Sequence, residues 1–196
     1  TERSPVPGSE RPALLFRLPA SHTLSVDAPV SKKPFRDGDG GFLLNLIAYL
    51  FGVRLQFHDW FFDRRVPVKL GKTTDFDILP ATPERFLSQA YKTWKAWPDE
   101  VKKRFTNVLY MSCRSPCYEW DWERFVIDYM VFDGMYKIAF ILRKVPCCGH
   151  RARLDNMCDA FDIPKGADHL DNIYNLRNEL FHETLWAGTQ PGRGID

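Results

Sequence analysis

The chain lacks any hydrophobic run long enough to cross a membrane. Its longest uncharged apolar stretch, residues 40–53, is shorter than the roughly 20 residues that a transmembrane helix needs. We therefore predict a buried helix there and no membrane partner. The N-terminus also lacks the basic start, apolar middle and small-residue cleavage site of a signal peptide, so we expect no secretion and a cytoplasmic location.

The five cysteines are an odd number in a chain without secretory features. This predicts reduced thiols rather than a disulfide framework. Cys113, Cys117, Cys147, Cys148 and His150 are in principle enough soft ligands for zinc. Neither cysteine pair has the spacing of a zinc knuckle, however, so we predict small structural thiols and no bound metal.

The chain has almost no net charge: 27 basic and 25 acidic residues give +2. This balance neither demands nor excludes nucleic acid, because a local basic patch matters more than the sum. The 196 residues are 44% hydrophobic and 14% aromatic, which is enough for a substantial core. Composition therefore predicts a folded protein of one large domain or two small ones.

The first 80 residues predict a small mixed α/β region, because short β-rich segments flank one apolar helix. The expected elements are an extended arm over 1–12, a hairpin of strands 13–18 and 22–26, a helix over 42–51 and a hairpin formed by residues 54–62 and 63–68.

Residues 81–196 predict a bundle of about four helices, so the fold as a whole is expected to be mainly α. Thr82 and Pro83 form a helix start, and Pro98 opens another helix. The segment 122–142 is the most apolar helix and is expected to be buried. A short turn at residues 147–150 leads to a further helix, and the last one follows.

The last helix, within residues 173–183, carries an arginine on its apolar side. On an ideal helix each residue advances by about 100°, and Arg177 then falls inside the stripe formed by Ile173, Leu176, Leu180 and Phe181. A guanidinium in that position is costly unless a carboxylate, a second subunit or a ligand meets it. Asp128 and Asp133, from the apolar helix, are both candidate partners, and the sequence does not choose between them.

Asn178 and His182 lie four residues apart, on another side of the same helix. Histidine titrates near neutrality and can exchange a proton, whereas arginine keeps its charge and can hold a phosphate oxygen. The combination is typical of chemistry on phosphate. The structural alternative is a buried ion pair of Arg177 together with an ordinary surface histidine.

These residues resemble a known family. Leu176-Arg177-Asn178 followed by Leu180-Phe181-His182 is similar to the signature of the HEPN superfamily (higher eukaryotes and prokaryotes nucleotide-binding), in which an arginine and a polar residue precede a histidine. Four residues separate Arg177 from His182 here. The likeness extends through residues 128–142, 150–154 and 157–163. It implies an HEPN-like domain over 81–196, preceded by an accessory region over 1–80.

The resemblance implies a metal-independent endoribonuclease without a cofactor. Two copies would pair their signature helices, so that Arg177, Asn178 and His182 of both line one cleft. The RNA 2′-hydroxyl would attack, His182 would act as general base or acid, Arg177 would stabilise the phosphate charge and Asn178 would orient the histidine or the phosphate. Since Arg177 and His182 lie about 140° apart on an ideal helix, the partner chain is expected to supply the missing group.

A non-catalytic module remains the alternative, in which the same helices dimerise or bind a nucleotide or RNA. The resemblance further suggests a toxin–antitoxin, antiviral defence or stress role, with an antitoxin or another regulatory protein as partner. No residue of the sequence indicates which RNA is the target.

Overall fold

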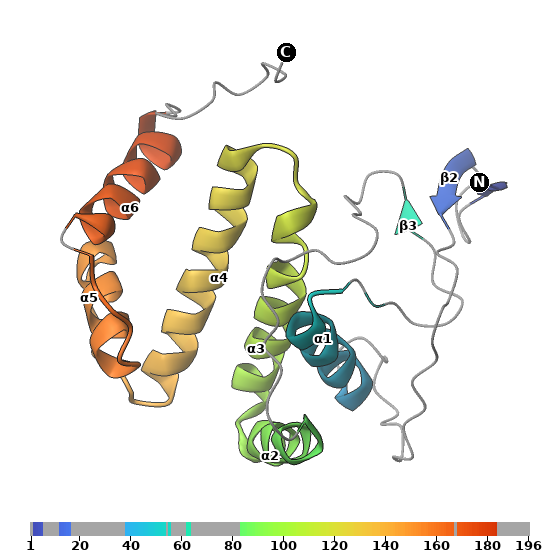
Figure 1. The fold of residues 1–196 in the computed structure, drawn as a ribbon, viewed down its shortest axis with the longest axis horizontal. Helices are drawn as coiled ribbons and strands as arrows, with labels where there is room; N and C mark the ends of the chain where they lie inside the picture. The colour runs from blue at the N-terminus through green and yellow to red at the C-terminus, as the bar shows by residue number, and fades with distance from the viewer. Residues whose placement is uncertain are drawn as a thin grey trace. The chain divides into compact units, whose positions relative to one another are not determined.

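The computed structural model of the chain is mainly helical, which confirms the predicted class, and it divides into two compact units, Thr1–Ala81 and Thr82–Asp196 (Figure 1). Among the described residues no helix is both long and apolar enough to span a bilayer. The structure describes residues 2–5, 12–16, 38–53, 55, 62–63, 83–166 and 168–183.

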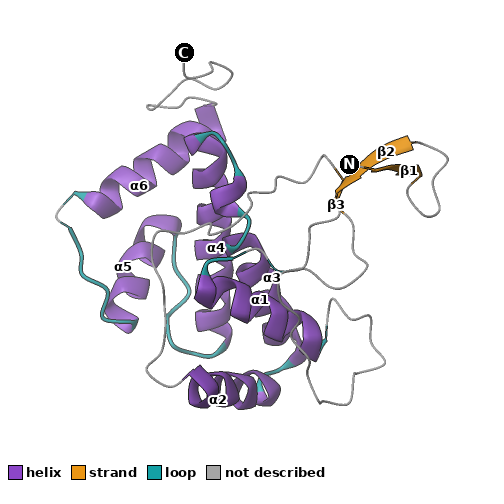
Figure 2. Cartoon of the chain, turned by 45° about the vertical axis from the view of Figure 1, so that its right-hand side comes forward, coloured by secondary structure: helices purple, strands orange, loops and turns teal. Residues whose placement is uncertain are grey.

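Within its described residues, the first unit contains a small antiparallel sheet (Figure 2). The prediction of an extended arm is wrong for the first strand, which pairs with the second. Pro5 and Pro12 face each other at one end of this ladder, where a missing N–H interrupts no further pairing. The expected strand 22–26 and nearly all of the hairpin over 54–68 lie outside the described residues. The strands, in sheet order, are β1 (Glu2–Pro5), β2 (Pro12–Phe16) and β3 (Phe62–Asp63).

The helix of the first unit, α1 (Asp39–Phe51), confirms the apolar helix expected over 42–51 and begins three residues earlier. Its buried residues Phe42, Leu46 and Leu50 follow each other at intervals of one helical turn. Gly52 ends the helix in the left-handed conformation at φ 60°, and its N–H bonds back to the carbonyl oxygen of Tyr49. Glycine adopts this conformation without steric strain.

In the second unit, α2 (Pro83–Ala96) and α3 (Asp99–Ser112) begin where the sequence predicts helix starts. Pro83 is the first helical residue of α2, and Pro98 is the N-cap of α3. A first-turn position suits proline because its ring presets φ and no N–H is required there. Asp99 then places a negative charge at the positive end of the α3 dipole.

The longest helix, α4 (Asp121–Ile141), confirms the helix expected over 122–142 and follows a short 3₁₀ turn, η2 (Ser115–Cys117). The expectation that this helix is buried holds only for part of its circumference. Met130 is 49% exposed, and Asp128 is also exposed. The side of α4 that carries Met130 and Lys137 is therefore open to solvent, while other sides pack on α3, α5 and α6.

Helices α3 and α4 approach each other closely around a glycine. Val101, Val108 and Ile138 form a buried cluster between them. A Cβ placed on Gly134 would lie 2.7 Å from Cγ2 of Val108, which is closer than two carbon atoms can pack. The absence of a side chain at position 134 thus sets the distance between these two helices.

We expect Gly134→Ala to lower the free energy of unfolding by about 1 kcal/mol. Overpacking against the stiff Val108 side chain costs about 1–3 kcal/mol, whereas the better helix propensity of alanine returns about 1 kcal/mol. In a Val108→Ala background the clash is gone, and the same substitution should stabilise the protein. Urea unfolding of the four proteins of this cycle measures both effects. Equal stabilisation in the two backgrounds would refute the close approach.

Helices α5 (His150–Ala160) and α6 (His169–Asn178) complete a helical bundle beside α4, and a π-helical turn, η3 (Glu179–Glu183), continues α6 (Figures 1 and 2). Leu154, Cys158 and Leu170 form the buried contact between α5 and α6. Phe132 of α4 packs against this cluster. The three helices are thereby held against one another.

The turn between α4 and α5 is tied down by one phenol. The hydroxyl of Tyr136 donates to the carbonyl oxygen of Pro146 at 2.8 Å and accepts the N–H of Cys148 at 3.1 Å. Nearby, Met157 and Val145 are buried in the same cluster as the Tyr136 ring. These contacts determine where α5 begins, and its first residue is a histidine.

Candidate active site on α4, α5 and α6

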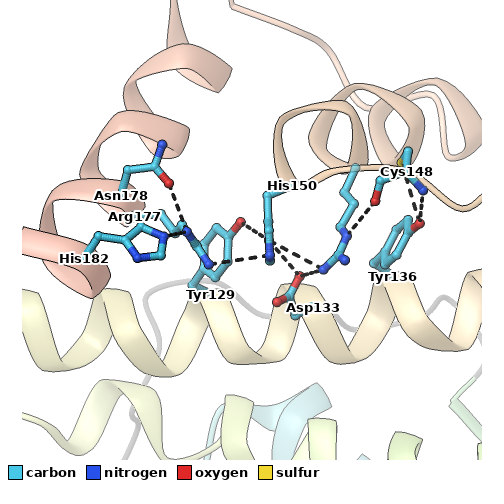
Figure 3. Close-up of polar contacts among 9 residues, drawn as sticks. Tyr129, Asp133, Tyr136, Cys148, His150, Arg177, Asn178 and His182 are labelled. Atoms are coloured by element: carbon cyan, nitrogen blue, oxygen red, sulfur yellow. Dashed lines mark hydrogen bonds and ion pairs between the residues drawn. The ribbon is translucent and has the colours of Figure 1, made fainter.

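Arg177 and His182 meet where the last helix changes its winding. In the π-helical turn η3, backbone hydrogen bonds join residues five apart, so residue i+5 returns toward residue i. Nη1 of Arg177 lies 2.7 Å from Nε2 of His182 (Figure 3). The separation of about 140° expected from an ideal α-helix is therefore wrong for this chain. One protomer alone brings the two groups together.

Asn178 and Phe181 complete the surroundings of the guanidinium on its own helix. Nη1 of Arg177 donates to Oδ1 of Asn178 at 2.9 Å, and the ring of Phe181 lies 5.5 Å from Cζ of Arg177. Nε of Arg177 is buried and, among the described residues, has no hydrogen-bond partner. The structure thus brings together all three residues that the sequence singled out, Arg177, Asn178 and His182.

Neither candidate aspartate is the partner of Arg177. Asp133 instead accepts a hydrogen bond from Nη1 of Arg153 at 3.0 Å, and Asp128 is exposed. Within the described part of the chain, no carboxylate lies within ion-pair distance of Arg177. The buried ion pair considered as the structural alternative is accordingly not formed with either aspartate, and no carboxylate among the described residues compensates the charge of Arg177.

His150 is the residue of this site that sequence reasoning missed. It is the first residue of α5, and its Nε2 lies 3.5 Å from Nη2 of Arg177 (Figure 3). Its Nδ1 lies 3.2 Å from the hydroxyl of Tyr129 and 3.9 Å from Oδ1 of Asp133. The sequence presented His150 as a possible zinc ligand and as part of the segment 150–154 of the family resemblance. It predicted no place for His150 in the Arg177 site, since nothing local relates it to a helix that starts 19 residues later.

The surroundings of His150 disfavour its charged form. Burial, together with the positive charges of Arg153 and Arg177, lowers the pKa of His150 below its ordinary value of 6.5, and Asp133 opposes this shift. Burial and then the Asp133 carboxylate raise the pKa of Tyr129 above 10.0, so its hydroxyl keeps its proton. At neutral pH the pair is consequently a neutral imidazole beside a neutral phenol.

We expect the lowered pKa of His150 to make the folded protein less stable in mild acid. A histidine that binds its proton more weakly in the folded state loses stability as pH falls from about 6.5, the unfolded value, through the folded pKa. Urea unfolding at a series of pH values between 7.5 and about 4.5 should show a smaller loss for His150→Gln than for wild type. His169→Gln is the matched control, since His169 is exposed and lies outside the cluster around Arg177. Parallel curves for wild type and His150→Gln would contradict the assignment.

Arg153 connects the site to the turn before α5. Its guanidinium lies over the ring of Tyr136 at 4.7 Å, and its Nε donates to the carbonyl oxygen of Cys148 at 3.3 Å. Since Nη1 also binds Asp133, this side chain is held from three directions. Arg153 and Asp133 neutralise each other, which leaves Arg177 as the cation with capacity for an anion.

The cysteines do not assemble with the site as metal ligands. All five are free thiols, and Sγ of Cys148 accepts a hydrogen bond from Nδ2 of Asn156 at 3.2 Å. Within the described ranges, no three His, Cys, Asp or Glu side chains lie together in a group suited to a metal ion. The donor set around Arg177 is nitrogen-rich and cationic, which favours an anion over a cation.

Chemically, the cluster places one arginine fork between two imidazoles and one amide. His182 is exposed and the His150 side chain is 32% exposed, so both are accessible to solvent. The fork can hold two oxygens of a phosphate, and the imidazoles can accept or donate protons near neutral pH.

Comparisons of this chain with models of protein families, with curated proteins and with solved structures find no match.

Proposed function

We propose that the protein is a metal-independent endoribonuclease that acts through Arg177, Asn178 and His182. The proposal rests on the hydrogen-bond partners of Arg177 and on its positive charge. Its guanidinium contacts Oδ1 of Asn178 and Nε2 of His182, and no described carboxylate compensates its charge. A phosphodiester supplies the missing negative charge and accepts both arms of the fork.

The reaction follows from the groups around the bound phosphate. The RNA 2′-hydroxyl attacks phosphorus and gives its proton to a base, while the bond from phosphorus to the 5′-oxygen breaks and that oxygen receives a proton from an acid. Arg177 stabilises the charge that grows on the nonbridging oxygens. Asn178 holds the guanidinium in position, and His182 provides one of the two proton transfers. The products are a 2′,3′-cyclic phosphate and a 5′-hydroxyl.

Within this proposal, residues 81–196 form an HEPN-like domain, and residues 1–80 are a mixed α/β accessory region. The packing of the Arg177 helix on α5 and on Phe132 of α4 supports this part of the proposal. A cytoplasmic toxin or antiviral role, with an antitoxin or another regulatory protein as partner, completes it.

A homodimer is part of the same proposal, although not for the reason that the sequence offered. Because η3 brings Arg177 and His182 together within one chain, a partner is not needed to unite them. Pairing across α6 would instead place two complete sites side by side and cover Phe181, which is 46% exposed. Light scattering at micromolar concentration tests this, and a strict monomer would refute the dimer while leaving the single-chain site intact.

The decisive experiment uses single-stranded RNA in excess chelator. Wild type should cleave it to products with 2′,3′-cyclic phosphate ends, and an oligonucleotide of DNA with one ribonucleotide should be cut only after that ribonucleotide. His182→Gln should lose this activity, whereas His169→Gln, a histidine on the same helix outside the site, should retain it. Tight binding of varied RNAs without cleavage would instead support the non-catalytic module. Equal cleavage by all variants would indicate a contaminating nuclease and refute the assignment.

A further inference from the structure

We propose that His150 is the second catalytic imidazole of this site, the general base that removes the proton of the 2′-hydroxyl, while His182 is the general acid. The inference rests on the proposed function, and it assigns separate roles to two histidines of one chain. Its basis is the placement of both rings against the same guanidinium.

Arg177 presents its two terminal nitrogens to the two histidines. Nη1 lies 2.7 Å from Nε2 of His182, and Nη2 lies 3.5 Å from Nε2 of His150 (Figure 3). A phosphate bound to both arms of the fork therefore has an imidazole Nε2 near each end of the fork. This arrangement matches the demand of the reaction, because the attacking and leaving oxygens lie on opposite sides of phosphorus.

The opposite side of the His150 ring is held in the orientation that a base requires. Nδ1 faces the Tyr129 hydroxyl at 3.2 Å and Oδ1 of Asp133 at 3.9 Å, both from α4, and Nη1 of Arg153 lies 3.5 Å from it. With its proton on Nδ1, the ring donates toward these oxygens and keeps the lone pair of Nε2 directed at Arg177. Arg177 can only donate, so its proximity to Nε2 favours the same tautomer. Arg153, also a donor only, opposes it at Nδ1 from 3.5 Å, but the Tyr129 hydroxyl lies nearer to Nδ1, at 3.2 Å, and can accept its proton.

Charges from every element around His150 act on its protonation. Asp133 of α4 stabilises the imidazolium, whereas Arg153 of α5, Arg177 of α6 and His182 of η3 oppose it. Burial first, and then the charges of Arg153 and Arg177, lower the pKa of His150, so the ring is neutral and able to accept a proton at pH 7. A general base needs this state before the reaction begins.

The proton balance then closes within one protomer. Nε2 of neutral His150 takes the proton of the 2′-hydroxyl as the 2′-oxygen forms its bond to phosphorus. Once the bound phosphate takes the place of His182 on Nη1 of Arg177, His182 carries a proton on Nε2 and gives it to the 5′-oxygen as the bond between that oxygen and phosphorus breaks. After product release, exchange with water returns both histidines to their starting states.

The test compares two substrates that differ only in how much they need an acid. In a ribodinucleotide the leaving group is the 5′-alkoxide, which must be protonated as it departs. In a ribonucleoside 3′-(4-nitrophenyl phosphate) the leaving group is 4-nitrophenolate, a weak base that departs without a proton. His182→Gln should lose about 10²–10⁴-fold in kcat/KM on the first substrate and recover most of it on the second. His150→Gln should lose about 10²–10⁴-fold on both.

A pH profile on the aryl substrate supplies a second readout. The activity of wild type and of His182→Gln should fall in acid as the base becomes protonated, and this limb should be absent from the residual activity of His150→Gln. His150→Asn, whose amide nitrogen replaces Nδ1, provides a second variant should the first fold poorly. Added imidazole should partly restore His150→Gly. His169→Gln should match wild type throughout.

The outcomes separate this inference from the function on which it rests. If wild type cleaves neither substrate, the nuclease itself is refuted. If wild type cleaves both and the folded His150 variants retain full activity, His150 is only structural and the inference is overturned. Recovery of the His150 variants on the aryl substrate would reverse the two roles and would equally overturn the assignment of the base.

Discussion

Replacing Arg177 with alanine should lower the rate of RNA cleavage by about 10²–10³-fold, the loss typical of removing one group that stabilises transition-state charge. The physical reason is that no other described cation is available at this place. Arg153 is already paired with Asp133 at 3.0 Å. Single-turnover cleavage of a short RNA in chelator measures the effect directly, without interference from product release.

Arg177→Lys should be nearly as damaging, although it keeps the charge. An ammonium is a single point, whereas the two arms of the arginine fork reach His182 and His150 on opposite sides. The matched control is Arg104→Lys on α3, since Arg104 makes an exposed ion pair with Glu100 and should tolerate the change. Full activity of Arg177→Lys would show that only charge matters and would contradict the fork.

The Arg177→Ala protein also offers a readout that is independent of RNA. Because the positive charge of Arg177 is among the causes that lower the pKa of His150, its removal should raise that pKa toward the ordinary value of 6.5. NMR titration of the histidine ring protons detects this shift, and His169 serves as the internal reference. An unchanged His150 titration would mean that the two side chains do not face each other in solution.

Leu154→Ala should lower the free energy of unfolding by about 2–5 kcal/mol, more than Gly134→Ala or Met130→Ala. Leu154 is 5% exposed and lies in the buried cluster with Cys158 and Leu170. Truncation removes apolar contacts and leaves a cavity that the rigid helices cannot fully close. Urea unfolding measures the loss. Met130→Ala on the open face of α4, where the side chain is 49% exposed, should change stability by less than about 0.5 kcal/mol.

Leu154→Ala should also affect the two histidines of the site differently. Contact between α5 and α6 depends on Leu154 and Leu170, whereas Arg177 and His182 belong to one continuous segment. Weakening the cluster should therefore loosen His150 from Arg177 before it disturbs the pair of Arg177 and His182. If Leu154→Ala were as stable as wild type, the cluster would not be what holds α6 in place.

The helices of the second unit were predictable because their signals are local. Pro83 and Pro98 mark helix starts through their fixed φ and missing N–H, and the apolar period of 122–142 indicates a helix wherever it packs. The pairing of residues 2–5 with 12–16 was not predictable in the same way. Strand pairing depends on segments meeting in space, and the proline-rich start predicted only an extended arm.

Sequence alone determined that Arg177, Asn178 and His182 share one short segment and that this arginine falls on an apolar helix face. Tertiary structure decided the rest. The π-helical turn at Glu179–Glu183 overturned the ideal-helix separation of Arg177 from His182, since the angle between two side chains depends on the winding of the backbone between them. The packing of α5 on α4 places His150 beside Arg177 and pairs Arg153 with Asp133. Which side chains of different helices meet depends on which helix faces pack together, and the local sequence pattern does not show this.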